Sequence, residues 1–251
     1  MKRYLMVILA ALSVSAPTTG ACLAAVPKAP AKDQVVQWKP DTAIGDAEGQ
    51  YKVAMIYYSG HGAKQDYAES MRWLRRSAAQ GNDKALNLIG YLYQQGLGVT
   101  RDYAEAMKWY RLSAAKGNDN AQNLIGYLYQ HGWGVTRDYA EAMRWYRLSI
   151  AKDNGAAEDN IGVIYEHGQG VPINYVEAMK WYRLAAAKGN DHEAELNIGS
   201  LYQRGLGVTR DYAEAMKWYR LSAAKGNEEA KENIRFLKEQ GLGGGLQHAQ
   251  I

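Results

Sequence analysis

The chain has 251 residues and a formal net charge of +4, and Lys and Arg alternate with Glu and Asp along it. This distribution excludes the concentrated basic surface of a nucleic-acid-binding protein. Hydrophobic residues make up 47% and charged residues 22%, so the composition predicts an ordinary globular protein.

Residues 1–25 have the pattern of a secretory signal peptide. A short basic start (residues 1–3) precedes an apolar run (residues 4–16), and small residues follow. The run is too short to span a bilayer comfortably, although an N-terminal membrane anchor is the alternative interpretation. We therefore expect export, to the periplasm or out of the cell. Cleavage is expected between Ala21 and Val26, after which no segment spans a membrane.

Cys22, the one cysteine, lies in this segment. Gly20 and Ala21 before it resemble the lipobox of bacterial lipoproteins, although Thr19 stands where leucine is usual. A lipid anchor on Cys22 is therefore an alternative. The rest of the chain contains no cysteine, so no disulfide is expected.

Residues 26–44 are predicted to be a Pro/Ala-rich linker. Four of the five prolines lie in the first 40 residues. Chain of this composition favours an extended, semi-rigid form or is disordered.

Beyond the linker a segment of about 36 residues repeats, and tryptophan marks its period. A fixed period of this length indicates an array in which each unit contacts mainly its neighbours. The marker residues are Trp73, Trp109, Trp145, Trp181 and Trp218. The predicted array, 45–240, comprises units 45–80, 81–116, 117–152, 153–188 and 189–225 and a C-terminal cap, 226–240, and a flexible tail, 241–251, follows it.

The second unit contains two helical patterns. Apolar residues recur with helical spacing from Asp83 to Gln95, and glycines then end this first helix, helix A. The second helix, helix B, begins near Asp102, a good N-cap with Glu105 three residues later. The sequence therefore predicts an all-α fold, an α/α superhelical solenoid of five and a half helix-turn-helix repeats.

A glycine recurs in the middle of helix A, at Gly90, Gly126, Gly162 and Gly199. A mid-helix glycine costs about 1 kcal/mol relative to alanine, so its return needs a packing reason. We expect the large indole of the paired helix B to be that reason. The cap has no helix B, and Arg235 takes the glycine position there.

The repeated pattern closely resembles the Sel1-like repeat, a relative of the tetratricopeptide repeat. This resemblance implies paired antiparallel helices stacked into a superhelix. It also implies a protein–protein interaction role, often in bacterial envelope or secreted proteins. Departures are Ala54 for the glycine of the first unit, Asn174 for the aspartate of the fourth, and one extra residue before Ala194. The second unit carries the pattern at Ala85, Ile89, Gly90, Tyr93, Gly96, Gly98, Val99, Asp102, Ala106, Trp109, Ser113 and Ala114.

The concave surface of an α-solenoid is usually lined by helix A. On the side of helix A opposite its core positions, residues change from unit to unit, so they are free to specify a partner. We expect an apolar, aromatic centre there, because exposed aromatic residues anchor interfaces. The alternative is that Leu88 and Leu124 pack against the neighbouring helix A and line nothing. The predicted groove residues are Asn87, Leu88, Tyr91, Asn123, Leu124, Tyr127, His131 and His167.

Two segments match the Ser-x-x-Lys motif of penicillin-recognising enzymes, one from Ser113 to Lys116 and one from Ser222 to Lys225. The partner motifs of that family are missing. The fourth unit has Ala185 at the same position, so the serine is interpreted as filling a small-residue slot.

His131 and His167 lie one unit apart on one predicted face. Zinc sites normally need three or four protein ligands, so we interpret both as solvated or partner-facing. His192 and Glu193 lack the second histidine of a zinc-protease helix, and neither a phosphate-binding loop nor a Gly-x-Ser-x-Gly motif is found. The sequence thus predicts no catalytic residue, metal or cofactor.

Regular repeats that lack any recognisable set of catalytic residues predict a non-enzymatic, exported protein-interaction module. It would act as an adaptor, assembly factor or regulator in the bacterial envelope and bind a peptide or protein in its concave groove. Two alternatives stay open, namely a secreted factor that binds a host protein and an envelope hydrolase of a β-lactam or peptidoglycan-like substrate.

Overall fold

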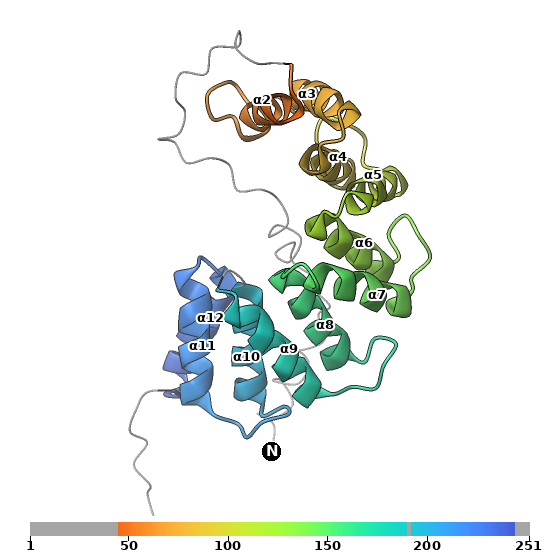
Figure 1. Cartoon of the computed structure of the whole chain (residues 1–251). Coiled ribbons are helices and arrows are strands. Elements are labelled where there is room, and N and C mark those ends of the chain that lie inside the picture. The colour runs from red at the N-terminus through yellow and green to blue at the C-terminus, as the bar shows by residue number, and fades with distance from the viewer. Residues whose placement is uncertain (1–44, 190–191, 244–251) are drawn as a thin grey trace, which may run out of the picture.

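The computed structural model describes residues 45–189 and 192–243, so the predicted signal peptide, the linker and most of the predicted tail lie outside it. The described residues form helices joined by loops (Figure 1), and no strand occurs among them. The helices are α2 (Ala47–Ser59), α3 (Tyr67–Ala79), α4 (Asp83–Gln95), α5 (Tyr103–Ala115), α6 (Asp119–His131), α7 (Tyr139–Ile150), α8 (Gly155–His167), α9 (Tyr175–Ala187), α10 (His192–Arg204), α11 (Tyr212–Ala224) and α12 (Glu228–Glu239).

The second repeat forms its two helices where the sequence predicts them. Helix α4 spans Asp83–Gln95 and stops at Gly96, whose left-handed backbone (φ 72°) lets its N–H donate to the Leu92 carbonyl. Asp102 caps α5, and its carboxylate accepts the Glu105 N–H at 2.9 Å. The even-numbered helices α2 to α10 are therefore helices A, and the odd-numbered helices α3 to α11 are helices B.

Buried side-chain hydrogen bonds hold the two helices of a repeat together. The Ser113 hydroxyl donates to the Asp83 carbonyl at 2.7 Å, which fixes the end of α5 against the start of α4. The Tyr110 hydroxyl donates to Gln94 Oε1 at 2.7 Å near the other end of the pair. The hairpin of the second repeat is thus closed at both ends.

The mid-helix glycine faces a tyrosine, so the predicted role of the indole is wrong. A Cβ on Gly90 would lie 2.6 Å from the ring of Tyr110, far inside contact distance. The first repeat retains Trp73 but carries Leu74 at the tyrosine position, and there Ala54 replaces the glycine. The glycine therefore accompanies the tyrosine rather than the tryptophan.

Successive repeats contact through the loop between helices A and B. Gly98 has a φ of 69°, and a Cβ on it would lie 2.7 Å from Cβ of Tyr67, the first residue of the preceding helix B. A side chain there would push the two repeats apart, so this position needs glycine for its backbone and for its space.

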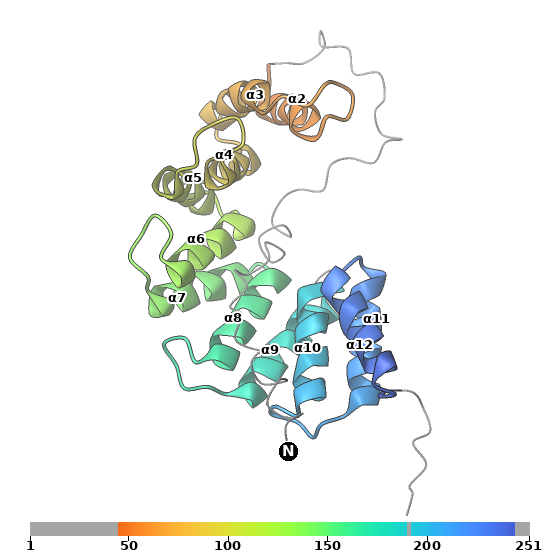
Figure 2. The ribbon, with the colours of Figure 1, turned by 180° about the vertical axis from the view of Figure 1, so that it is seen from behind.

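The stacked hairpins form a curved array (Figures 1 and 2). In the second repeat, α4 lies on the inner side of the arc and α5 on the outer side (Figure 1). Trp109 and Trp145 are half-buried and pack against core clusters that combine the preceding repeat with helix A of their own repeat. The tryptophans thus contribute to stacking between repeats.

Helix α12 covers the last hairpin. Its Ala230 and Leu237 are buried with Met216 and Tyr219 of α11, while Phe236 stays about half exposed. Within residues 45–189 and 192–243, no helix combines the length and the apolar character that crossing a membrane requires.

Candidate interaction surfaces

The predicted centre of the groove is buried, which corrects the expectation of an exposed apolar patch. Leu88 and Leu124 expose at most 1% of their surface, and both lie in core clusters. Leu88 packs with residues of α2 and α3, and Leu124 packs with residues of α5, so the neighbours include helices B as well as the helix A that the alternative named. The other four central residues, Asn87, Tyr91, Asn123 and Tyr127, expose between 1% and 8%.

Packing of each helix A against the helices of the preceding repeat explains this burial. Asn160 Nδ2 of α8 donates to Asn123 Oδ1 of α6 at 3.0 Å, and Asn197 of α10 donates to Asp159 of α8 at the same distance. Each helix A from α4 to α10 packs between its own helix B and the helix B of the preceding repeat, and α6 and α8 also contact each other. The residues opposite the hairpin core face these neighbours and not solvent.

A polar row follows the contacts between helices A in the later repeats. In addition to the two asparagine contacts, Arg204 pairs with Glu166 at 3.0 Å, and Gln130 donates to Gln169 at 2.7 Å. In the second repeat Asn87 Oδ1 is buried without a hydrogen-bond partner, because α6 has Leu124 at the position where α8 has Asn160. The inner face is thus apolar near the second repeat and polar towards the fifth.

An aromatic cluster remains accessible at the end of α6. We define it as Tyr103, Tyr127, His131 and Trp133. The His131 ring lies 4.2 Å from that of Tyr127 and 5.0 Å from that of Trp133, and the Trp133 ring lies 5.0 Å from that of Tyr103. Apart from the buried Tyr127, these rings are half-buried. Burial lowers the pKa of His131, and the nearby Arg137 guanidinium lowers it further, so the ring is neutral at pH 7.

The sequence prediction did not include Trp133. The sequence does distinguish this residue, which stands between the two glycines that follow helix A. Other repeats carry Leu97, Gln169 and Leu206 there. A single bulky aromatic residue at an otherwise aliphatic or polar position would have marked the third repeat.

His167, the other predicted histidine, is exposed, and its Nδ1 lies 3.0 Å from the Val163 carbonyl of its own helix. Among the residues with described positions, no three His, Cys, Asp or Glu side chains gather into a metal-holding group.

The serines of the two Ser-x-x-Lys matches make structural contacts. Ser222 Oγ donates to the His192 carbonyl at 2.6 Å, as Ser113 does to Asp83. Lys225 pairs instead with Glu195 at 2.7 Å. Ser222 and Lys225 therefore have different partners. The hydroxyls of Ser113 and Ser222 each donate a hydrogen bond to a backbone carbonyl.

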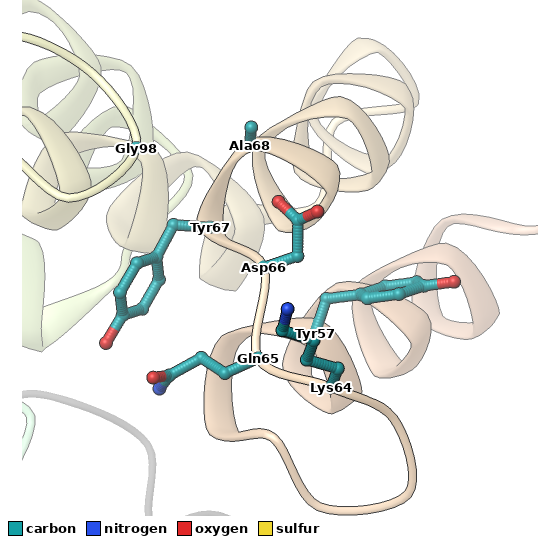
Figure 3. A pocket seen from close by; sticks show the side chains of 7 residues that line it. All are labelled: Tyr57, Lys64, Gln65, Asp66, Tyr67, Ala68 and Gly98. Atoms are coloured by element: carbon teal, nitrogen blue, oxygen red, sulfur yellow. The ribbon is translucent and has the colours of Figure 1, made fainter.

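Two grooves lie outside the inner face. The first, of about 530 Å³, lies beside the loop before α3, and Gly98 of the next repeat reaches it. Figure 3 shows the Tyr67 ring and the Gln65 amide on one side of this segment and the Tyr57 ring on the other. The second groove, of about 420 Å³, lies between α3 and α5 and includes Leu86, Trp109 and Leu112.

Comparison with known proteins finds a match to one protein family. The Sel1 repeat model matches residues 47–82, 83–118, 119–154, 155–190 and 192–227. Among solved structures, the chain is similar to a Sel1 repeat protein from Oxalobacter formigenes. The identity is 32% and the TM-score 0.74, with 82% of this chain and 83% of that chain covered. None of the curated proteins matches the chain.

The chain is also similar to c5321, a protective antigen present in uropathogenic Escherichia coli strains that displays an SLR fold. The identity is 36% and the TM-score 0.66 over 79% of this chain, which spans only 42% of that chain's length. A sel1 repeat protein from Klebsiella pneumoniae, 22% identical with a TM-score of 0.56, shares the fold over 81% of this chain and 98% of that one.

Proposed function

Because the chain belongs to the Sel1 repeat family, whose repeats are protein-interaction modules, we propose that it is an exported scaffold for a peptide or protein segment. Members of the family are generally non-catalytic, protein-binding scaffolds. The scaffold acts as an adaptor, assembly factor or regulator in the bacterial envelope. Export rests on the signal-like pattern of residues 1–25.

The aromatic cluster supports this function best. Its rings contact one another at 4.2 to 5.5 Å and are held at the junction of α6 and the following loop. Rigid aromatic rings offer contact area at little cost in conformational entropy, which suits them to anchor a partner side chain. The neutral His131 ring can donate or accept one hydrogen bond at the edge of the site. The partner segment therefore binds over the end of α6 and the loop that follows it.

The test replaces the cluster with residues that the second repeat carries at the same positions. His131→Gln together with Trp133→Leu copies Gln95 and Leu97, so the fold should be retained. Partners are cross-linked to the wild-type protein in envelope extract, identified by mass spectrometry and titrated in purified form. We expect the double variant to bind the purified partner about tenfold or more weakly, since lost aromatic anchors typically cost at least this much.

The matched control is Ile173→Ser, which changes a 58% exposed residue in a different loop. This variant should bind like the wild type. A partner that binds the cluster variant with unchanged affinity would show that the cluster is not the binding site.

The similarity to c5321 supports a second candidate, a secreted factor that binds a host protein. That relative is described as a protective antigen, and this chain spans less than half of it. The same variants test this candidate when the extract comes from host cells. No observation favours the hydrolase alternative, because the candidate serine hydroxyls donate to backbone carbonyls.

A further inference from the structure

The groove between α3 and α5, here called the outer groove, has an apolar interior. Leu86 of α4 is 6% exposed and Trp109 is half-buried, whereas Leu112 is 52% exposed and forms part of the rim. The volume of about 420 Å³ is large enough for one or two side chains. None of these residues belongs to the aromatic cluster.

Two cations also line the outer groove, Arg75 from α3 and Lys116 at the end of α5. Arg75 donates to the Tyr93 hydroxyl at 3.1 Å, a neutral partner. Across the part of the chain that the structure describes, neither cation forms an ion pair. The groove therefore combines an apolar interior with two positive charges that no carboxylate neutralises.

Other repeats neutralise the lysine at this position. Lys188 pairs with Glu158 at 3.1 Å and with Asp153 at 2.7 Å, and Lys225 pairs with Glu195 at 2.7 Å. Glu158 and Glu195 stand where the second repeat has Leu86. The second repeat has thus replaced a carboxylate with an apolar side chain and left its lysine available to a ligand.

Basic residues outnumber acidic ones in helices B and the loops before them. Helices B with the loops before them contain nineteen basic and nine acidic residues. Such an excess attracts acidic partners and speeds their association. The segments counted are residues 61–80, 97–116, 133–152, 169–188 and 206–225.

We propose that the outer groove binds an acidic segment of a partner protein. One aliphatic or aromatic side chain of the segment inserts beside Leu86 and Trp109, and carboxylates on either side of it pair with Arg75 and Lys116. The apolar interior distinguishes this ligand from a purely polyanionic one, because only a segment with an apolar side chain uses both features. This site is separate from the aromatic cluster and does not depend on the function proposed for it.

The probe is a fluorescein-labelled peptide, Gly-Glu-Asp-Leu-Asp-Glu-Gly, titrated against the full-length protein by fluorescence anisotropy. We expect saturable binding with one site per chain. Binding should weaken with added salt, because surface ion pairs are screened. A peptide with serine for leucine, or with lysine for every acidic residue, should bind at least about tenfold more weakly.

Leu86→Glu is the decisive variant, because it recreates the Glu–Lys pair that the chain already uses twice. The new carboxylate neutralises Lys116 and repels the peptide, so affinity should fall by about tenfold or more. Gln122→Glu makes the equivalent change one repeat further along and should leave affinity unchanged. Equal far-ultraviolet circular dichroism and melting temperatures would show that both variants are folded.

A gain-of-function variant tests the same idea from the other direction. Glu195→Leu gives the fifth repeat the composition of the second, since Arg183, Trp218, Leu221 and Lys225 already stand at the equivalent positions. We expect the number of binding sites per chain to rise from one to two.

Absence of saturable binding to the wild type, equal affinity for the serine peptide, or unchanged affinity in Leu86→Glu would each overturn the proposal. Tighter binding of duplex DNA than of the peptide, lost in Leu86→Glu, would also overturn it and assign the groove to nucleic acid. The variant with His131→Gln and Trp133→Leu should bind the peptide normally, which separates this site from the aromatic cluster.

Discussion

At the scale of single residues, the pairing of glycine with tyrosine sets the distance between the two helices of a repeat. Gly90 lets α4 approach the Tyr110 ring, and the tyrosine hydroxyl then reaches Gln94 across the same contact. The first repeat uses the pair Ala54 and Leu74 instead. The two pairs are alternative solutions to one packing problem.

Gly90→Ala should therefore be destabilising, although alanine is the better helix former. The added methyl would overlap the Tyr110 ring, and such overpacking typically costs about 1 to 3 kcal/mol. Adding Tyr110→Leu recreates the pair of the first repeat and should restore part of the loss. Urea denaturation of the two single variants and the double variant measures this coupling, expected at about 1 kcal/mol or more. Additive effects would contradict the proposed packing.

At the scale of elements, the two helix types differ in how many sides they bury. In the second repeat, α4 has buried residues around most of its circumference, whereas α5 buries only Ala106, Met107, Tyr110 and Ser113. The difference arises because α4 packs between its own helix B and the helix B of the preceding repeat. Leucines such as Leu112 and Leu184, each about half exposed, consequently lie on the outer side.

A serine near the end of helix B fastens it to the start of helix A. Ser113 donates to the Asp83 carbonyl at 2.7 Å, whereas the fourth repeat has the buried Ala185 at this position. Ser113→Ala should lower the free energy of unfolding by about 1 kcal/mol, because a buried hydrogen bond is lost. Ala185→Ser should raise it by a similar amount if the new hydroxyl reaches the Gly155 carbonyl.

Urea denaturation of both variants provides the measurement. The pair forms an internal control, since one variant removes and the other adds the same group. A Ser113→Ala protein as stable as the wild type would contradict the role assigned to the hydroxyl.

At the scale of the whole molecule, each repeat is stabilised by its neighbours, so the last hairpin needs a cover. Ala230 and Leu237 of α12 supply it by burying Met216 and Tyr219, which are only 1% exposed. The other side of α12 is polar and carries residues such as Lys231 and Glu232. This arrangement ends the stack without exposing an apolar face.

Truncation after Gly226 removes α12 and should destabilise α10 and α11 most. We expect a lower denaturation midpoint and self-association, because the uncovered apolar surface favours contact between chains. Light scattering coupled to gel filtration, together with urea denaturation, measures both effects. Truncation after Gly243 keeps α12 and serves as the control. A stable monomer after the first truncation would mean that α12 is not a structural cap.

The sequence by itself determined the local structure. The bounds of α4, the N-cap at Asp102 and the stop at Gly96 follow from short-range rules, because helix spacing, capping side chains and left-handed glycines act within a few residues. The period then implied that these hairpins repeat along the chain. The helical solenoid and the Sel1 repeat family are both confirmed.

Only the tertiary structure decided which variable positions face solvent. Variation between repeats suggested exposure for Leu88 and Leu124, but packing against the preceding repeat buries both. Periodicity within one helix reports the face towards its own partner helix and carries no information about neighbours on the other sides. The aromatic cluster and the outer groove likewise depend on residues from different helices and loops, so their assembly required the stacked array.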